Sequence, residues 1–167
     1  MKNSKLVLAF MALSLFLIIS ACSNDDEKEG EKSIVGNWTF STVTADVIES
    51  NSSDNNSKIG TFIEKMGRSY HSNGYLIFTE DGKVTSGFSD EEGTSTSSYT
   101  FKNGILTVTD GEYIYTASAS VDGNKFYLYE DLAEEFNNLK LDELLELGFK
   151  DASTKATKAI VKVTFTK

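Results

Sequence analysis

Residues 99–108, YTFKNGILTV, decide the fold of this chain, because they contain its strongest β-hairpin signal. The central Asn-Gly pair suits a two-residue type I′ turn, which needs positive φ at both positions. Such a turn places Phe101 opposite Leu106 and gathers the large apolar side chains on one face, with the threonines on the other. The apolar residues of that face are Tyr99, Phe101, Leu106 and Val108.

Two Asp-Gly pairs extend this pattern on either side of the hairpin. The pair at 110–111 predicts another two-residue turn, which sets Tyr113 opposite Val108. The pair at 81–82 predicts instead a three-residue loop with a left-handed glycine, because that register keeps Phe78 on the apolar face.

Short β-rich runs separated by turns predict an antiparallel meander. The chain has no proline and is rich in threonine, serine, tyrosine and phenylalanine, which favours β structure. A flat meander would expose its apolar face to solvent and leave its edge strands unpaired. Closing the sheet into a barrel removes both problems. We therefore predict an all-β fold, an eight-stranded antiparallel up-and-down barrel. The predicted strands are residues 35–45, 75–79, 83–89, 95–102, 105–109, 112–121, 125–130 and 159–167.

Two segments interrupt the meander, and both show the apolar spacing of amphipathic helices. The first, residues 46–74, follows the first strand and is long enough to predict a lid or binding loop. The second, residues 131–150, precedes the last strand and looks like two short helices. We expect this second insert to cover outward-facing side chains, namely Tyr127, Tyr129, Ile77 or Ile114.

The amino-terminal segment has the features of a secretory signal. Two lysines precede an unbroken run of apolar residues and serine from 6 to 19, which is too short to span a bilayer comfortably. Residues 19–22, ISAC, then place small residues before the only cysteine, Cys22. We predict a signal peptide over residues 1–21.

Residues 19–22 resemble a lipobox, the site where bacterial lipoprotein signals are cut and the new terminal cysteine is lipidated. The resemblance implies a multiply acylated Cys22, with palmitate among its chains, and a membrane anchor that does not span the bilayer. Cleavage without lipidation, which leaves a free thiol, is the alternative. Residues 22–32 are charged and predict a flexible acidic tether. Ser23 resembles an outer-membrane sorting signal, and the acidic run beyond it resembles either a surface-export tether or an ordinary linker.

Residues 36–38, GNW, resemble the G-x-W signature of the calycin and lipocalin group. With segments 76–82 and 103–108, the resemblance is to the lipocalin-like domains of bacterial lipoproteins, and it covers residues 33–167. It implies a single barrel domain whose closed end is plugged by Trp38. The helical insert departs from the lipocalin pattern by preceding the last strand. The first insert is more similar to the portal helices of fatty-acid-binding proteins. For this reason the resemblance to lipocalins implies no particular class of ligand for this chain.

Composition argues against several classes of function. The formal net charge of −9 provides no electrostatic footprint for nucleic acid. Cys22 is assigned to lipidation, and His71, the only histidine, lies in a polar loop without a recognisable partner. No acidic residue lies on the predicted inner face. We expect no enzymatic activity, no cofactor and no metal site.

The first functional hypothesis is that a small, largely apolar ligand binds in the lumen beneath the 46–74 segment. Ala117 is small enough to leave space, and inward tyrosines offer hydroxyl groups. The alternative is a lumen filled by its own side chains. The candidate lumen residues are Trp38, Phe40, Phe78, Tyr99, Phe101, Tyr113, Tyr115 and Ala117.

The second hypothesis is an interaction module at the outer membrane or cell surface. Outward aromatic residues such as Tyr127 and Tyr129, beside an amphipathic helix, motivate this alternative. Such a module would bind a protein or glycan partner through its loops or its helix.

Overall fold

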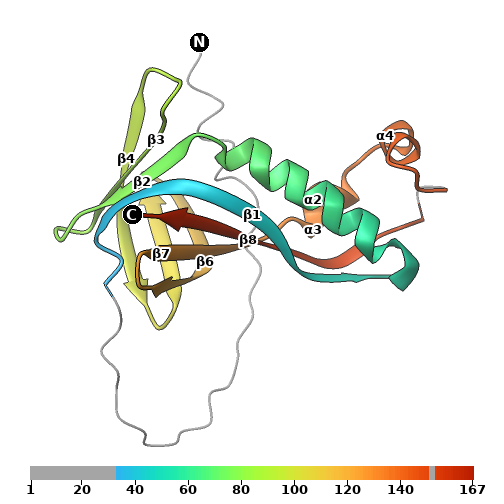
Figure 1. The fold of residues 1–167 in the computed structure, drawn as a ribbon, viewed down its shortest axis with the longest axis horizontal. Helices are drawn as coiled ribbons and strands as arrows, with labels where there is room; N and C mark the ends of the chain where they lie inside the picture. The colour runs from blue at the N-terminus through green and yellow to red at the C-terminus, as the bar shows by residue number, and fades with distance from the viewer. Residues whose placement is uncertain (1–32, 151–152) are drawn as a thin grey trace, which may run out of the picture.

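The structure of the protein is a computed structural model that describes residues 33–150 and 153–167. Its eight strands form a closed antiparallel barrel in which each strand pairs with its neighbours in sequence and the last pairs with the first (Figure 1). The predicted up-and-down barrel is therefore confirmed. The predicted signal peptide, the tether and Cys22 lie outside the described residues. The elements are β1 (Gly36–Ser50), η1 (Ser53–Asn55), α2 (Asn56–His71), β2 (Gly74–Phe78), β3 (Lys83–Phe88), β4 (Thr94–Lys102), β5 (Ile105–Asp110), β6 (Tyr113–Asp122), β7 (Lys125–Asp131), α3 (Ala133–Asn137), α4 (Leu141–Glu146) and β8 (Ala156–Thr166).

The hairpin that decides the fold forms in the predicted register. The turn at 103–104 has positive φ at both residues, 53° and 73°, as a type I′ turn requires. Phe101 lies opposite Leu106. The three-residue loop between β2 and β3 is also confirmed, since Phe78 lies opposite Val84.

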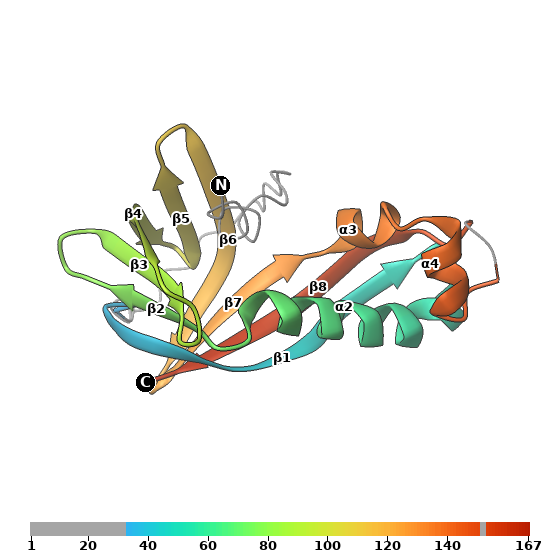
Figure 2. The same ribbon diagram turned by 90° about the horizontal axis from the view of Figure 1, so that it is seen from above.

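The predicted register between β5 and β6 is wrong by two residues. Tyr113 lies opposite Asp110, and Tyr115 takes the predicted place opposite Val108. The turn is formed by residues 111–112, with its glycine at φ 60° in the first central position. A shift of two keeps every side chain on its predicted face. It also lengthens the hairpin, which projects from the barrel in Figure 2, and leaves Tyr113 62% exposed.

Aromatic rings fill the closed end of the barrel, where β1 begins. Phe126 is fully buried, and its ring centroid lies 5.7 Å from Trp38, 5.6 Å from Phe78 and 5.8 Å from Phe165. The indole Nε1 of Trp38 donates a hydrogen bond of 2.8 Å to the Ile34 carbonyl, so its polar group is satisfied. Side chains of the protein itself therefore occupy this end.

Helix α2 lies along the parts of β1 and β8 that extend beyond the rest of the barrel (Figures 1 and 2). Its buried face contains Ile59, Gly60, Ile63 and Gly67. A Cβ atom at Gly67 would lie 3.1 Å from Cγ1 of Val43, so glycine permits the close approach of helix and strand. The first insert thus forms a helix, as predicted, but this helix is built into the core.

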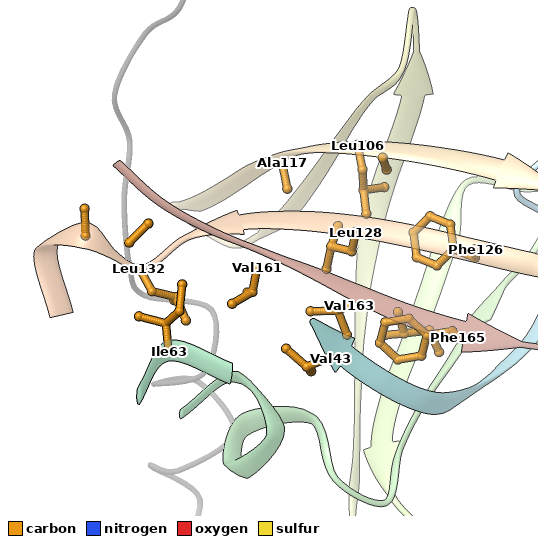
Figure 3. Packing of buried hydrophobic residues seen from close by; sticks show 14 of the residues in the cluster. Val43, Ile63, Leu106, Ala117, Phe126, Leu128, Leu132, Val161, Val163 and Phe165 are labelled. Carbon is orange, nitrogen blue, oxygen red and sulfur yellow. The ribbon is translucent and has the colours of Figure 1, made fainter. Parts of the chain in front are cut away.

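One hydrophobic core runs from the barrel to the helices (Figure 3). Val161 and Val163 of β8 connect Phe165 inside the barrel with Ile63 on the buried face of α2. Leu132, just after β7, joins the same cluster. Barrel and helices therefore form a single packing unit.

The second insert forms two short helices, as predicted, and packs against α2. The Phe136 ring lies 6.0 Å from Phe62 of α2 and 5.4 Å from Phe149. The expectation that this insert covers outward-facing side chains is wrong for Ile114, which is 69% exposed. The chain leaves β7 toward α2, whereas Ile114 lies near the tip of the projecting hairpin.

Candidate functional site

The inner wall of the barrel becomes accessible toward the end where β7 and α2 finish and β2 begins, which we call the mouth. On β6, the inward residues change from buried Ala117 to half-buried Tyr115, and Tyr113, the next residue on that face, is exposed. On β5, they change from buried Leu106 to half-buried Val108. Inward side chains near the mouth are thus incompletely covered by the protein's own residues.

The candidate lumen residues do not form one surface. The hydroxyl of Tyr99 donates to the Thr79 carbonyl at 3.0 Å, so it is already engaged near the closed end. Tyr113 lies beyond the rim and lines no interior wall. The remaining candidates pack within or against the core, with Trp38, Phe78 and Ala117 buried and Phe40, Phe101 and Tyr115 half-buried.

Three polar side chains form a hydrogen-bonded group, which we call the mouth triad: His71, Tyr115 and Glu130. Oε2 of Glu130 lies 2.8 Å from Nε2 of His71, and the Tyr115 hydroxyl donates to Oε1 of Glu130 at 2.9 Å. The His71 and Glu130 side chains are only 13% and 11% exposed. The triad thus connects the last residue of α2 with β6 and β7.

Two members of the triad were not predicted. His71 was expected in a polar loop without a partner, but it ends α2 and pairs with Glu130. Acidic residues were expected to lie away from the inner face, yet Glu130 continues the inward series of Phe126 and Leu128 along β7. The two-residue period of a strand would have placed Glu130 inside.

Burial raises the pKa of Tyr115 well above its usual value of 10.0, and the charge and hydrogen bond of Glu130 raise it further. The Tyr115 hydroxyl therefore stays protonated and remains a donor to Glu130 at any physiological pH. The triad presents a protonated phenol and a carboxylate inside the mouth.

This pKa predicts a loss of stability at alkaline pH. Folded Tyr115 holds its proton more tightly than the unfolded chain does, so the free energy of unfolding falls as pH rises above about 10, by up to about 1.4 kcal/mol per pH unit. In Tyr115→Phe, unfolding measured by denaturant titration at several pH values should show a shallower alkaline decline. Tyr113→Phe, which alters an exposed tyrosine on the same strand, should keep the wild-type slope. An unchanged slope in Tyr115→Phe would contradict the assignment.

The part of the chain that the structure describes contains neither a metal-binding cluster nor a membrane-spanning helix. No three or more histidine, cysteine, aspartate or glutamate side chains are grouped there so as to hold a metal ion. None of the helices among those residues is long and apolar enough to cross a membrane. The mouth offers an apolar wall beside hydrogen-bonding groups, an arrangement suited to binding.

Comparison of the chain with protein-family models, curated proteins and solved structures gives no match. The geometry of the mouth is therefore the basis for assigning a function.

Proposed function

We propose that this is a lipid-anchored envelope protein whose lipocalin-like barrel binds a small, largely apolar molecule at its mouth, without catalysis. The supporting observation is the meeting of two surfaces there. Val108, which lies opposite Tyr115, is a half-buried apolar side chain of the inner wall there. The mouth triad supplies buried polar groups for one end of the molecule. Specific small-molecule sites commonly combine an apolar wall with a few such groups.

The closed end does not contribute to this proposed site. Trp38, Phe78 and Phe126 are at most 2% exposed, and the Phe126 ring contacts the rings of the other two. Interior packing of this kind leaves few voids larger than a water molecule. The ligand would therefore occupy the mouth half of the barrel, beside α2.

Native mass spectrometry of the full protein, purified from envelopes in a mild detergent, tests this proposal. We expect a small molecule that co-purifies and is released at higher collision energy. Val108→Trp, which fills the inner wall, should abolish the adduct. Thr109→Trp places the same ring on the outer face of the same strand and should retain it. An adduct of equal abundance in both variants would argue against the mouth as the site.

The proposed anchor is Cys22, which becomes the acylated amino terminus once residues 1–21 are removed. It would attach the protein to the outer membrane, and the acidic tether resembles those that accompany export to the cell surface. The intact mass from the same experiment reports this directly. An amino terminus at Cys22 with added acyl chains would support the anchor, and an unmodified cysteine would refute it.

The second candidate function is an interaction module for a protein or glycan partner. Leu141 and Leu145 favour it, because they lie one turn apart on α4 and are 50% and 51% exposed. A macromolecule that co-purifies, with no small-molecule adduct, would favour this function. Loss of that partner in Leu145→Asp, with no loss in Ile114→Asp, would place the contact on α4.

A further inference from the structure

Strand β6 pairs with β7 along only part of its length. It pairs with β5 from Tyr113 onward, but its pairing with β7 begins at Ser118, opposite Tyr129. Before that point the β5–β6 hairpin diverges from β7, which continues toward α3 (Figure 2). Residues 113–117, which we call the β6 edge, therefore have no strand partner on the β7 side within the described part of the chain.

The register shows which backbone groups lie on the open side of the β6 edge. Ala119 of β6 donates its N–H to the Gly104 carbonyl, on the β5 side, at 2.8 Å. Backbone groups alternate between the two sides of a strand, so the odd-numbered residues of β6 bond toward β5. The N–H and C=O groups of Ile114 and Thr116 therefore point to the open side. Such a row of groups is a template for pairing with another strand.

The side chains of the β6 edge add an apolar contact surface to these backbone groups. Ile114 is 69% exposed and lies on the outer face of the strand, and Tyr113 is 62% exposed on the opposite face. A strand added to this edge would place its own side chains directly beside both. Open backbone groups give affinity in strand addition, and side-chain contacts on the two faces give specificity.

The charge around the β6 edge selects the kind of strand that it fits. Asp110, which lies opposite Tyr113, and Glu112 are both exposed at the hairpin tip. Residues 105–122 contain no lysine or arginine that would offset these acids within the hairpin. A second copy of the same edge would bring like charges together, which is destabilising across paired strands. A segment that carries lysine or arginine would instead meet opposite charge.

We propose that the β6 edge binds an extended segment of a partner protein, in which apolar and basic residues alternate, as an added strand. The backbone of this segment pairs with Ile114 and Thr116. Its apolar side chains lie beside Ile114 on the outer face, and its basic side chains lie on the face that carries Tyr113 and Asp110. This surface is separate from the exposed leucines of α4. The inference goes beyond small-molecule binding and does not depend on it.

Fluorescence anisotropy of labelled peptides, titrated with the full protein in one mild detergent, tests charge and strand pairing separately. The probe is a capped peptide that alternates valine and lysine. A valine–glutamate peptide reverses its charge, and a fully N-methylated valine–lysine peptide keeps the charge but has no backbone donors. We expect the probe to bind at least about tenfold more tightly than the N-methylated form, which loses its hydrogen bonds to the carbonyls of Ile114 and Thr116. The valine–glutamate peptide should bind most weakly. Equal binding of the probe and either control would overturn the proposal.

Ile114→Pro removes a backbone donor from the open side and leaves the hydrogen bonds of the β5–β6 hairpin in place. It should weaken binding of the probe by about three- to tenfold. Ile114→Val keeps the donor and a similar side chain, and should bind as the wild type does. The fluorescence of Trp38 reports whether each variant retains the native closed end. Unchanged binding in a folded Ile114→Pro variant would contradict pairing at this edge.

A matched pair of charge variants keeps the proposal testable if Ile114→Pro does not fold. Asp110→Asn combined with Glu112→Gln removes two charges beside the β6 edge. Glu91→Gln combined with Glu92→Gln removes two exposed charges from the loop between β3 and β4. Only the first combination should weaken binding of the probe. Equal effects of the two combinations would overturn selection by charge at the hairpin.

Native mass spectrometry of the full protein distinguishes a second copy from a basic partner. A wild-type dimer that becomes a monomer in Ile114→Pro would assign the β6 edge to self-association and overturn the proposal. A monomer that binds the probe would support it. Neither result bears on a small-molecule adduct, which is tested by Val108→Trp, so the two proposals fail independently.

Discussion

Replacing Phe126 by alanine is expected to lower the free energy of unfolding by about 3–5 kcal/mol. Phe126 is fully buried and lies between the rings of Trp38, Phe78 and Phe165. Its removal leaves a cavity in the closed end that these large rings can fill only in part. This loss would consume a large share of the stability of an ordinary domain.

Denaturant titration, followed by the fluorescence of Trp38, measures this loss at the site itself, because Trp38 is the only tryptophan. Tyr113→Ala removes an aromatic ring from the exposed hairpin tip and should change stability by about 0.5 kcal/mol or less. Similar losses in the two variants would contradict the packing of the closed end. They would also indicate that Tyr113 lies on the inner wall, as the sequence analysis predicts.

Replacing Ile63 by aspartate is expected to have an even larger effect. Ile63 is fully buried where α2 meets Val161 and Leu132 (Figure 3). Loss of such a side chain costs about 2–5 kcal/mol, and an unpaired buried carboxylate adds several kcal/mol more. We expect the whole domain to unfold, because helix and barrel share one core.

Circular dichroism together with Trp38 fluorescence tests this coupling. Thr61→Asp introduces the same charge on the exposed side of α2 and should leave both signals native. A variant Ile63→Asp that loses helix signal but keeps Trp38 buried would show that α2 detaches as an independent lid. Loss of both signals together would establish α2 as part of the folding unit.

The barrel was predictable because turn chemistry and strand period agree along most of the chain. Asn103 takes the positive φ that a type I′ turn demands, and this local choice sets the pairing of two strands. The β5–β6 error has a physical cause. A shift of two residues preserves the faces, so the apolar pattern cannot distinguish the registers.

Strand β1 was predicted too short because irregularities interrupt its alternation. Its pairing with β8 shifts between Phe40 and Thr42 and again between Ala45 and Val47. A bulge moves the following side chains to the other face, so a strict two-residue period fails beyond it. The strand therefore continues to Ser50 through a segment whose sequence resembles a loop.

The candidate site was less predictable than the fold. Glu130 could have been placed inward from strand period alone, but its partner His71 lies 59 residues away in sequence. The burial of the Tyr115 hydroxyl beside Glu130 likewise depends on closure of the barrel. These are tertiary properties that no local pattern encodes.

The pairing of β1 with β8 has a consequence for how the protein acquires its shape. These strands are the first and last in chain order, and their seam also supports α2. Contacts between such distant segments are slow to form, because a long stretch of chain must be closed before they contribute. Until β8 docks, the nascent sheet has two unpaired edges, and each is a template for association with another copy. Closure of this seam is therefore the step at which assembly competes with aggregation.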